Sequence, residues 1–231
     1  MPAALIVAHG SPADPAPQEA ALQALAAQVG AHLPGWTVLG ATLAMPGALE
    51  TALDQVGPDA MIYPFFMAQG WFTGRELPRR LTAAGARGRR QLDPFGTDPD
   101  LPALMARVAT DGAATHGLPP RASTLLLAAH GSKVSRTSAD STYAMADHLR
   151  RLTDFAHIEV GFVEESPFLD DAARIDGPAL CLPFFALRAG HVAGDVPEAL
   201  AKAGFSGPLL PAIGEHPQAA ALIAAALMRQ G

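Results

Sequence analysis

Leu5-Ile6-Val7-Ala8-His9-Gly10-Ser11, near the start of the chain, returns as Leu126-Leu127-Ala128-Ala129-His130-Gly131-Ser132. A second stretch, Tyr63-Pro64-Phe65-Phe66, returns as Leu182-Pro183-Phe184-Phe185. The two pairs follow the same order at nearly the same spacing, which chance matches do not produce. A period this long is typical of a duplicated domain rather than of a solenoid repeat. The sequence therefore predicts two homologous halves.

Each half alternates short apolar runs with alanine-rich segments of helical length. The predicted strands are residues 4–8, 37–43, 60–66, 90–92, 124–129, 157–163, 179–184 and 208–210. The predicted helices are residues 16–33, 47–56, 75–84, 101–115, 135–153, 168–174, 195–203 and 217–229. Apolar strands without strict alternation, separated by helices, indicate parallel sheets covered on both faces. We expect an α/β fold of two similar doubly wound parallel-sheet domains, residues 1–117 and 118–231.

Composition excludes several classes of protein. The chain has 231 residues, of which 49% are hydrophobic and 16% charged, with a formal net charge of −6. A negative charge argues against a general nucleic-acid binder, which needs a basic face. The single cysteine, Cys181, excludes an internal disulfide framework. No apolar run is long enough to span a membrane and no signal-peptide pattern opens the chain, so we expect a soluble cytoplasmic protein.

Polar residues follow three predicted strands of the second half. His130 closes the first strand, Glu164 follows the second, and His191 lies in the loop after the third. Ligands of open α/β sheets bind outside the carboxyl ends of the strands, so these side chains are expected to converge. Two imidazoles and a carboxylate suit a divalent ion such as Co²⁺, Fe²⁺, Ni²⁺ or Zn²⁺. The set predicts a metal site in the second half.

The first half serves as an internal comparison. His9 matches the first histidine of the set, whereas counting from the repeated prolines places Leu43 opposite the glutamate and Phe72 opposite the second histidine. Residues that served only the fold would give the two copies no reason to differ at these positions. The pattern therefore indicates a metal site kept in the C-terminal half and degraded in the N-terminal half.

These motifs resemble those of the class II tetrapyrrole chelatases. An apolar strand ending in His-Gly-Ser, a Glu after the second strand and the segment 182–197 carry the likeness, which extends over nearly the whole chain. The sequence is similar to the sirohydrochlorin cobaltochelatases of CbiX and CbiK type, in their long two-domain form. The resemblance implies two α/β domains facing a central cleft that binds the tetrapyrrole. It also implies that His130, Glu164 and His191 bind the metal and accept protons.

The function implied by the resemblance is a metal-inserting lyase that places Co²⁺ into sirohydrochlorin in cobalamin biosynthesis. It needs no cofactor beyond the substrate metal ion, with Fe²⁺ or Ni²⁺ as other possible ions. The alternatives are a sirohydrochlorin ferrochelatase of sirohaem synthesis, a non-catalytic metal or tetrapyrrole carrier, and a hydrolase. The expected partners are sirohydrochlorin and a divalent ion, with no nucleic acid or membrane, and the chain is a monomer or a homo-oligomer. One or two of Arg75, Arg79, Arg80 and Arg188 are candidates to pair with substrate carboxylates.

Overall fold

The structure is a computed structural model that describes residues 1–133, 136–187 and 194–230. Its contacts divide the chain into two compact units, Met1–Asp98 with Pro217–Gly231, and Pro99–His216. The units do not follow the sequence repeat, because each contains one helix that belongs by sequence to the other half. Helix α8 (Gln218–Met228) packs against α1 (Pro15–Ala31) in the first unit, and α4 (Leu101–Thr115) packs against α5 (Thr137–Leu152) in the second.

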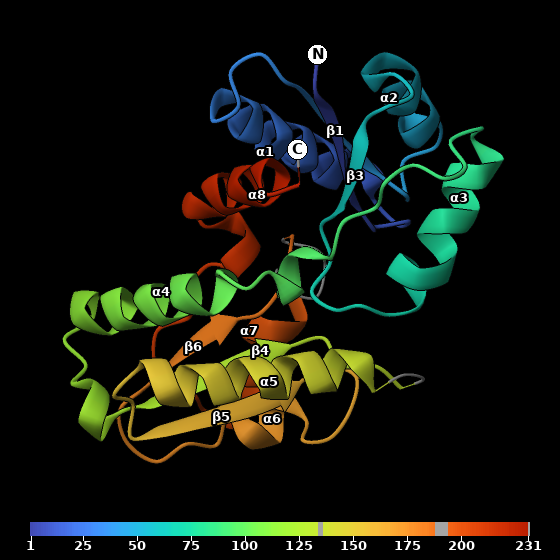
Figure 1. Ribbon diagram of the computed structural model, residues 1–231. Coiled ribbons are helices and arrows are strands. Elements are labelled where there is room, and N and C mark those ends of the chain that lie inside the picture. The colour runs from blue at the N-terminus through green and yellow to red at the C-terminus, as the bar shows by residue number, and fades with distance from the viewer. Residues whose placement is uncertain (134–135, 188–193, 231) are drawn as a thin grey trace. The chain divides into compact units, whose positions relative to one another are not determined.

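The first unit is built on a three-stranded parallel sheet in the order β2-β1-β3. Its strands are β1 (Ala3–Ala8), β2 (Thr37–Thr42) and β3 (Met61–Pro64), and its remaining helices are α2 (Ala48–Val56) and α3 (Leu77–Ala83). Helices α1 and α8 cover one face of the sheet and α2 and α3 the other (Figure 1). A π-helical turn, Phe72–Glu76, leads directly into α3.

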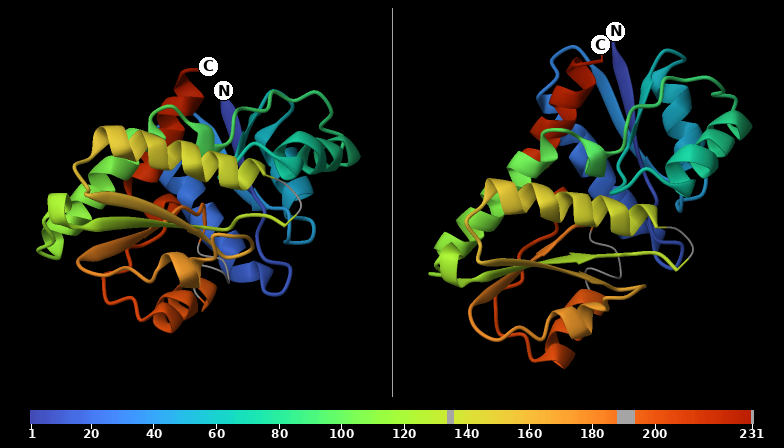
Figure 2. Two further views of the ribbon diagram at one scale, coloured as in Figure 1. Left: turned by 90° about the horizontal axis from the view of Figure 1, so that it is seen from below. Right: turned by 60° about the horizontal axis from the view of Figure 1, so that its bottom comes forward.

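The second unit repeats this plan in the order β5-β4-β6, again parallel. Its strands are β4 (Thr124–Ala129), β5 (His157–Phe162) and β6 (Ala179–Pro183), and its remaining helices are α6 (Leu169–Ala172) and α7 (Val196–Ala203). The right-hand view of Figure 2 shows its strands between α4 and α5 on one side and α6 and α7 on the other. Short 3₁₀ turns lie at Phe95–Thr97, Pro120–Ala122 and Ile213–Glu215.

The central strand of each sheet is the core of its unit. Every residue of β1 and of β4 is buried. A strand covered by helices on both faces has no polar side, which is why its sequence is a continuous apolar run. Cys181 lies in this core and is fully buried, and burial raises the pKa of its thiol. The predicted α/β class with parallel sheets is confirmed.

The predicted fourth strands are the main difference from the expected elements. They are reduced to isolated bridges, Ile62 with Gln91 and Cys181 with Leu209. Each bridge carries two backbone hydrogen bonds, for example from Ile62 N to Arg90 O and from Leu92 N to Ile62 O. Proline has no N–H to donate, and prolines lie at positions 94, 208 and 211, so these segments cannot extend the ladder.

In the described part of the chain, every helix is too short or too polar to span a bilayer.

Candidate functional site

The His-Gly-Ser turns at the ends of β1 and β4 share one geometry. Gly10 and Gly131 adopt φ values of 75° and 73°, a region that glycine occupies without strain. At Gly131 a Cβ would lie 2.9 Å from Glu165 Cγ, and at Gly10 it would lie 2.8 Å from Thr42 Cβ. Only glycine fits either turn, and the turn sets the direction of the preceding histidine.

Both histidines use the same ring nitrogen in the turn. His9 Nδ1 lies 2.7 Å from Gly10 O, and His130 Nδ1 lies 3.0 Å from Gly131 O. A carbonyl oxygen only accepts, so Nδ1 is the protonated nitrogen in this arrangement and Nε2 carries the lone pair of the neutral ring. In a metal-binding histidine whose Nδ1–H is held by a backbone carbonyl, Nε2 is the metal ligand, and Nε2 is the nitrogen that His130 would use.

Two adjacent glutamates follow β5 and point to different partners. Glu164 N donates to His130 O over 2.9 Å, which joins the ends of β4 and β5. The side chain of Glu164 is 30% exposed, and its Oε2 lies 2.8 Å from Lys133 Nζ. Glu165 Oε1 instead accepts a 2.7 Å hydrogen bond from Ser132 N and packs under the turn. The Glu164 carboxylate thus lies in an exposed ion pair at the carboxyl ends of the strands, whereas Glu165 supports the turn.

One correspondence between the two halves requires correction. The register pairs Leu43 N with Ala8 O at 2.9 Å and Val163 N with Ala129 O at 3.0 Å, so Leu43 matches Val163. Ala44 N donates to His9 O as Glu164 N donates to His130 O, which makes Ala44 the counterpart of the glutamate. The earlier match to Leu43 was counted back from Pro46 and Pro167. It is wrong by one residue, because the loop after β5 has one more residue before its proline than the loop after β2. The first copy still lacks the carboxylate.

The correspondence between Phe72 and His191 in the sequence is supported by matching positions that precede and follow both residues. Val7 pairs with Pro64 as Ala128 pairs with Pro183, and α3 and α7 begin at the same distance beyond those prolines. In the first copy the rings of His9 and Phe72 meet edge to face, with centroids 4.4 Å apart. His191 itself lies outside the described residues.

The structure therefore places His130 and Glu164 at neighbouring strand ends. Within the described residues, no three His, Cys, Asp or Glu side chains form a cluster that could hold a metal. A groove of about 540 Å³ lies elsewhere on the first unit, along β2, α1 and α2, and its lining includes none of the predicted site residues. The buried Glu19 in that lining has partners of its own, accepting from Thr42 N at 2.7 Å and Thr42 Oγ1 at 2.6 Å.

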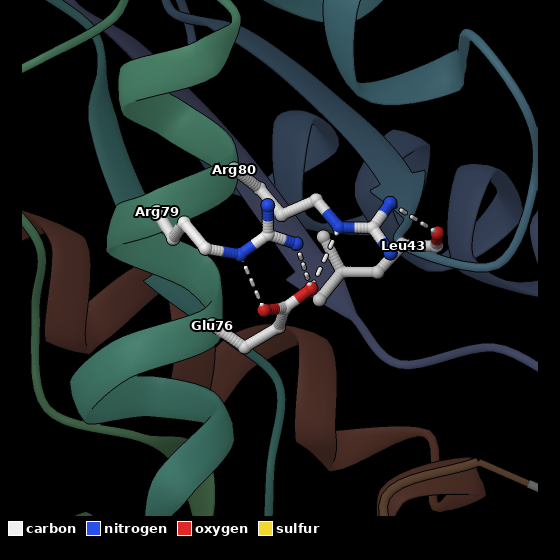
Figure 3. Close-up of polar contacts among 4 residues, drawn as sticks. All are labelled: Leu43, Glu76, Arg79 and Arg80. Carbon is white, nitrogen blue, oxygen red and sulfur yellow. Dashed lines mark hydrogen bonds and ion pairs between the residues drawn. The ribbon is translucent and has the colours of Figure 1, made fainter.

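A cationic cluster lies at the corresponding edge of the first unit (Figure 3). The Glu76 carboxylate accepts from Arg79 Nε at 2.8 Å and Nη2 at 2.7 Å, and from Arg80 Nε at 2.8 Å. Arg80 Nη1 also donates to Leu43 O over 3.2 Å. Hydrogen bonds from Arg79 and then Arg80 lower the pKa of Glu76 to about 2, and Glu76 in turn raises the pKa of Arg79.

A sequence model of the CbiX family matches residues 3–111 and 124–230, which is nearly all of both halves. The chain belongs to the CbiX family. Two separate matches within one chain also agree with the duplication predicted from the sequence. The fold and the His-Gly-Ser turns described above are therefore the framework of a CbiX protein.

Three relatives show how far the likeness extends. A CbiX structure described as the terminal enzyme for biosynthesis of siroheme in denitrifying bacteria is 48% identical, over 99% of each chain, with a TM-score of 0.91. A multi-domain protein of Deinococcus radiodurans, described as structurally similar to chelatases, is 26% identical over 98% of this chain and 55% of its own, with a TM-score of 0.76. A probable sirohydrochlorin cobaltochelatase of Halobacterium salinarum is 25% identical over 61% of this chain and 56% of its own length. This chain thus spans little more than half the length of the latter two proteins.

The sequence placed His130 and Glu164 at neighbouring strand ends, as the structure does, but it did not reveal the groups that contact them. Glu165 looks like its neighbour in the sequence, and only the contact with Ser132 N distinguishes the two. The pairing of Glu76 with Arg79 and Arg80 was missed as well, although the i,i+3 and i,i+4 spacing of these residues on the predicted helix 75–84 favours it.

Proposed function

We propose that this chain inserts a divalent metal ion into sirohydrochlorin, with His130, Glu164 and His191 as the residues that deliver the metal and accept protons. The observation that carries the proposal is the difference between the two copies of the His-Gly-Ser motif. The second copy has a glutamate and a histidine at the two matching positions of its sequence, and the first copy has apolar residues there. Ala44 and Phe72 occupy the places of Glu164 and His191 in the first copy. In the first copy the rings of His9 and Phe72 lie with their centroids 4.4 Å apart.

The chemistry of insertion fits these side chains. Placing M²⁺ in the macrocycle removes two pyrrole N–H protons and strips water from the ion. A neutral imidazole with its lone pair on Nε2 binds the ion, and it accepts a proton near pH 7 once the metal has left. Glu164 offsets the ionic charge and offers a further proton acceptor. An incomplete ligand shell suits an ion that must be released to the product.

For the physiological metal we propose Fe²⁺, with Co²⁺ as the second candidate. The CbiX structure of siroheme biosynthesis is 48% identical over the full chain, which supports iron. The Halobacterium relative, a probable cobaltochelatase, supports the cobalt expected from the sequence, at 25% identity over part of the chain. The ligand types do not separate the two ions, because the affinity order favours later metals whatever the task.

The test is an anaerobic absorbance assay of the purified chain with sirohydrochlorin and Fe²⁺, Co²⁺ or Ni²⁺ in turn. Insertion shifts the visible bands of the macrocycle, so the rate above the uncatalysed control measures catalysis and ranks the metals. His130→Ala should lower the rate by about 100-fold or more, because it removes both a ligand and a proton acceptor. Stoichiometric binding without catalysis for any metal would instead identify a carrier.

His157→Ala is the matched control. His157 is an exposed histidine of the same sheet, but it is the first residue of β5. It therefore lies at the amino ends of the parallel strands, whereas His130 follows the carboxyl end of β4. It should keep the full insertion rate. Both variants should unfold at the same urea concentration as the unaltered chain, because both histidines are exposed. Full activity in a folded His130→Ala variant would contradict the proposed role.

A further inference from the structure

The two copies differ in a second way, opposite in direction to the loss of the metal ligands. Helices α3 and α7 begin at matching positions, and Leu77 and Val196 are both fully buried there. The residues that follow the shared proline are Arg79 and Arg80 in the first copy, whereas the second copy has Glu198 and Ala199. The first copy therefore carries two cations where its duplicate carries none.

The arginine pair lies near the carboxyl ends of the strands of its sheet, where ligands of open α/β sheets bind. The π-helical turn that holds Glu76 directly precedes α3 and follows β3, so this end of α3 lies beside the carboxyl ends of the strands. Arg80 also donates to the carbonyl of Leu43, the residue immediately after β2. The exposed Trp71 and the partly buried Phe72 begin the same segment and provide apolar surface beside the cations.

The cluster is fixed in place and retains positive charge. The Glu76 side chain is 10% exposed and bonds to both guanidinium groups, whose own side chains are 65% exposed at Arg79 and 43% at Arg80. One carboxylate neutralises one of the two charges. Each guanidinium has five N–H donors, of which Arg79 and Arg80 use two each in the contacts described here. Among the described residues, Glu76 is the one carboxylate that contacts either arginine.

We propose that the Arg79–Arg80 pair, held by Glu76, is a binding site for a carboxylate group of the tetrapyrrole substrate. The proposal rests on the proposed function, which gives the chain a polycarboxylate ligand. A guanidinium pairs with a carboxylate through parallel hydrogen bonds, and a braced guanidinium loses little conformational freedom on binding. Glu76 acts as a positioning residue, because it contacts the arginines rather than the ligand.

The test compares the affinity for metal-free sirohydrochlorin, followed by its absorbance, between the unaltered chain and Arg79→Gln/Arg80→Gln. We expect the dissociation constant and the KM for sirohydrochlorin to rise about tenfold, with kcat and the KM for the metal nearly unchanged. Added salt should weaken binding by the unaltered chain more than binding by the variant. Arg79→Lys/Arg80→Lys keeps the charge and should retain part of the affinity.

Two further variants test whether a change in affinity comes from misfolding or from the lower total charge of the chain. Arg79→Glu/Arg80→Ala installs the residues of the second copy and should bind more weakly still, with an unfolding midpoint that shows the chain is folded. Arg87→Gln/Arg121→Gln removes two exposed cations, one in the turn beyond α3 and one in the other unit, and should bind normally.

The outcomes separate this proposal from the proposed function. A folded Arg79→Gln/Arg80→Gln variant that binds sirohydrochlorin as tightly as the unaltered chain would overturn the carboxylate site, even if insertion proceeds normally. An unaltered chain that binds sirohydrochlorin and inserts no metal would refute insertion, and weaker binding by the arginine variants would then still support the site.

Discussion

Glu164 and Glu165 are adjacent and chemically identical, yet their surroundings give them different expected roles. The Glu164 carboxylate contacts the exposed Lys133, whereas that of Glu165 accepts from the backbone N–H of Ser132. A hydrogen bond from a backbone amide to a charged acceptor stabilises a fold more than an exposed ion pair does. The two residues therefore allow stability and activity to be measured separately at one turn.

Glu165→Ala should lower the free energy of unfolding by about 2 kcal/mol, because it leaves the Ser132 amide without its charged acceptor and empties the space beneath Gly131. Glu164→Ala should change stability by less than about 0.5 kcal/mol and strongly reduce metal insertion. Urea unfolding of both variants, with the insertion assay alongside, checks the distinction. Equal losses of stability would show that the two carboxylates are not separated in this way.

At the scale of the element, the π-helical turn Phe72–Glu76 ends in a carboxylate whose pKa differs between the folded and the unfolded chain. Arg79 and Arg80 lower the pKa of Glu76 from 4.5 to about 2, so the folded state holds this proton less tightly than the unfolded chain does. The resulting stabilisation is fully present above about pH 4.5 and is lost as the pH falls towards about 2.

Glu76→Gln should therefore remove part of the pH dependence of unfolding in that acidic window, while the difference from the unaltered chain stays constant at higher pH. Urea unfolding between pH 6 and pH 2.5 gives the comparison. Glu50→Gln is the control, since Glu50 is an exposed glutamate on α2 of the same unit. If the two variants followed the same acid profile, the arginines would not be holding the Glu76 carboxylate in its charged form.

The same turn shows where prediction from the sequence ends. Apolar runs located the central strands, because a strand buried on both faces must be apolar, and the ends of β4 and β5 then pointed to His130 and Glu164 as candidates. The helix expected at residues 75–84 begins as α3 only at Leu77, after a π-helical turn that also contacts the ring of His9 and the side chain of Gln91. The match of Leu43 to Glu164 was wrong for a related reason: one extra loop residue shifts the count, and only the strand register reveals it.

At the scale of the whole molecule, the compact units exchange a helix relative to the sequence repeat. Helix α8 belongs by sequence to the second copy, but Arg229 Nη2, just beyond its end, donates to Asp98 Oδ2 over 2.7 Å in the first unit. The guanidinium of Arg90 contacts Gln230 as well. The buried face of α8 is made of alanine, leucine and isoleucine, so it needs the apolar partner that α1 supplies.

The exchange predicts which pieces of the chain fold alone. A fragment of residues 99–216 contains a complete sheet with helices on both faces and should unfold cooperatively. The sequence repeat 118–231 has nearly the same length, but it lacks α4 and carries α8 without α1, so it should expose apolar surface and aggregate or unfold without a sharp transition. Thermal unfolding followed by circular dichroism separates the two cases. A cooperative transition in fragment 118–231 alone would mean that the repeat is the folding unit. In that case the buried face of α8 would have to pack on its own half of the sequence. That result would contradict the contacts between α8 and α1 in the first unit.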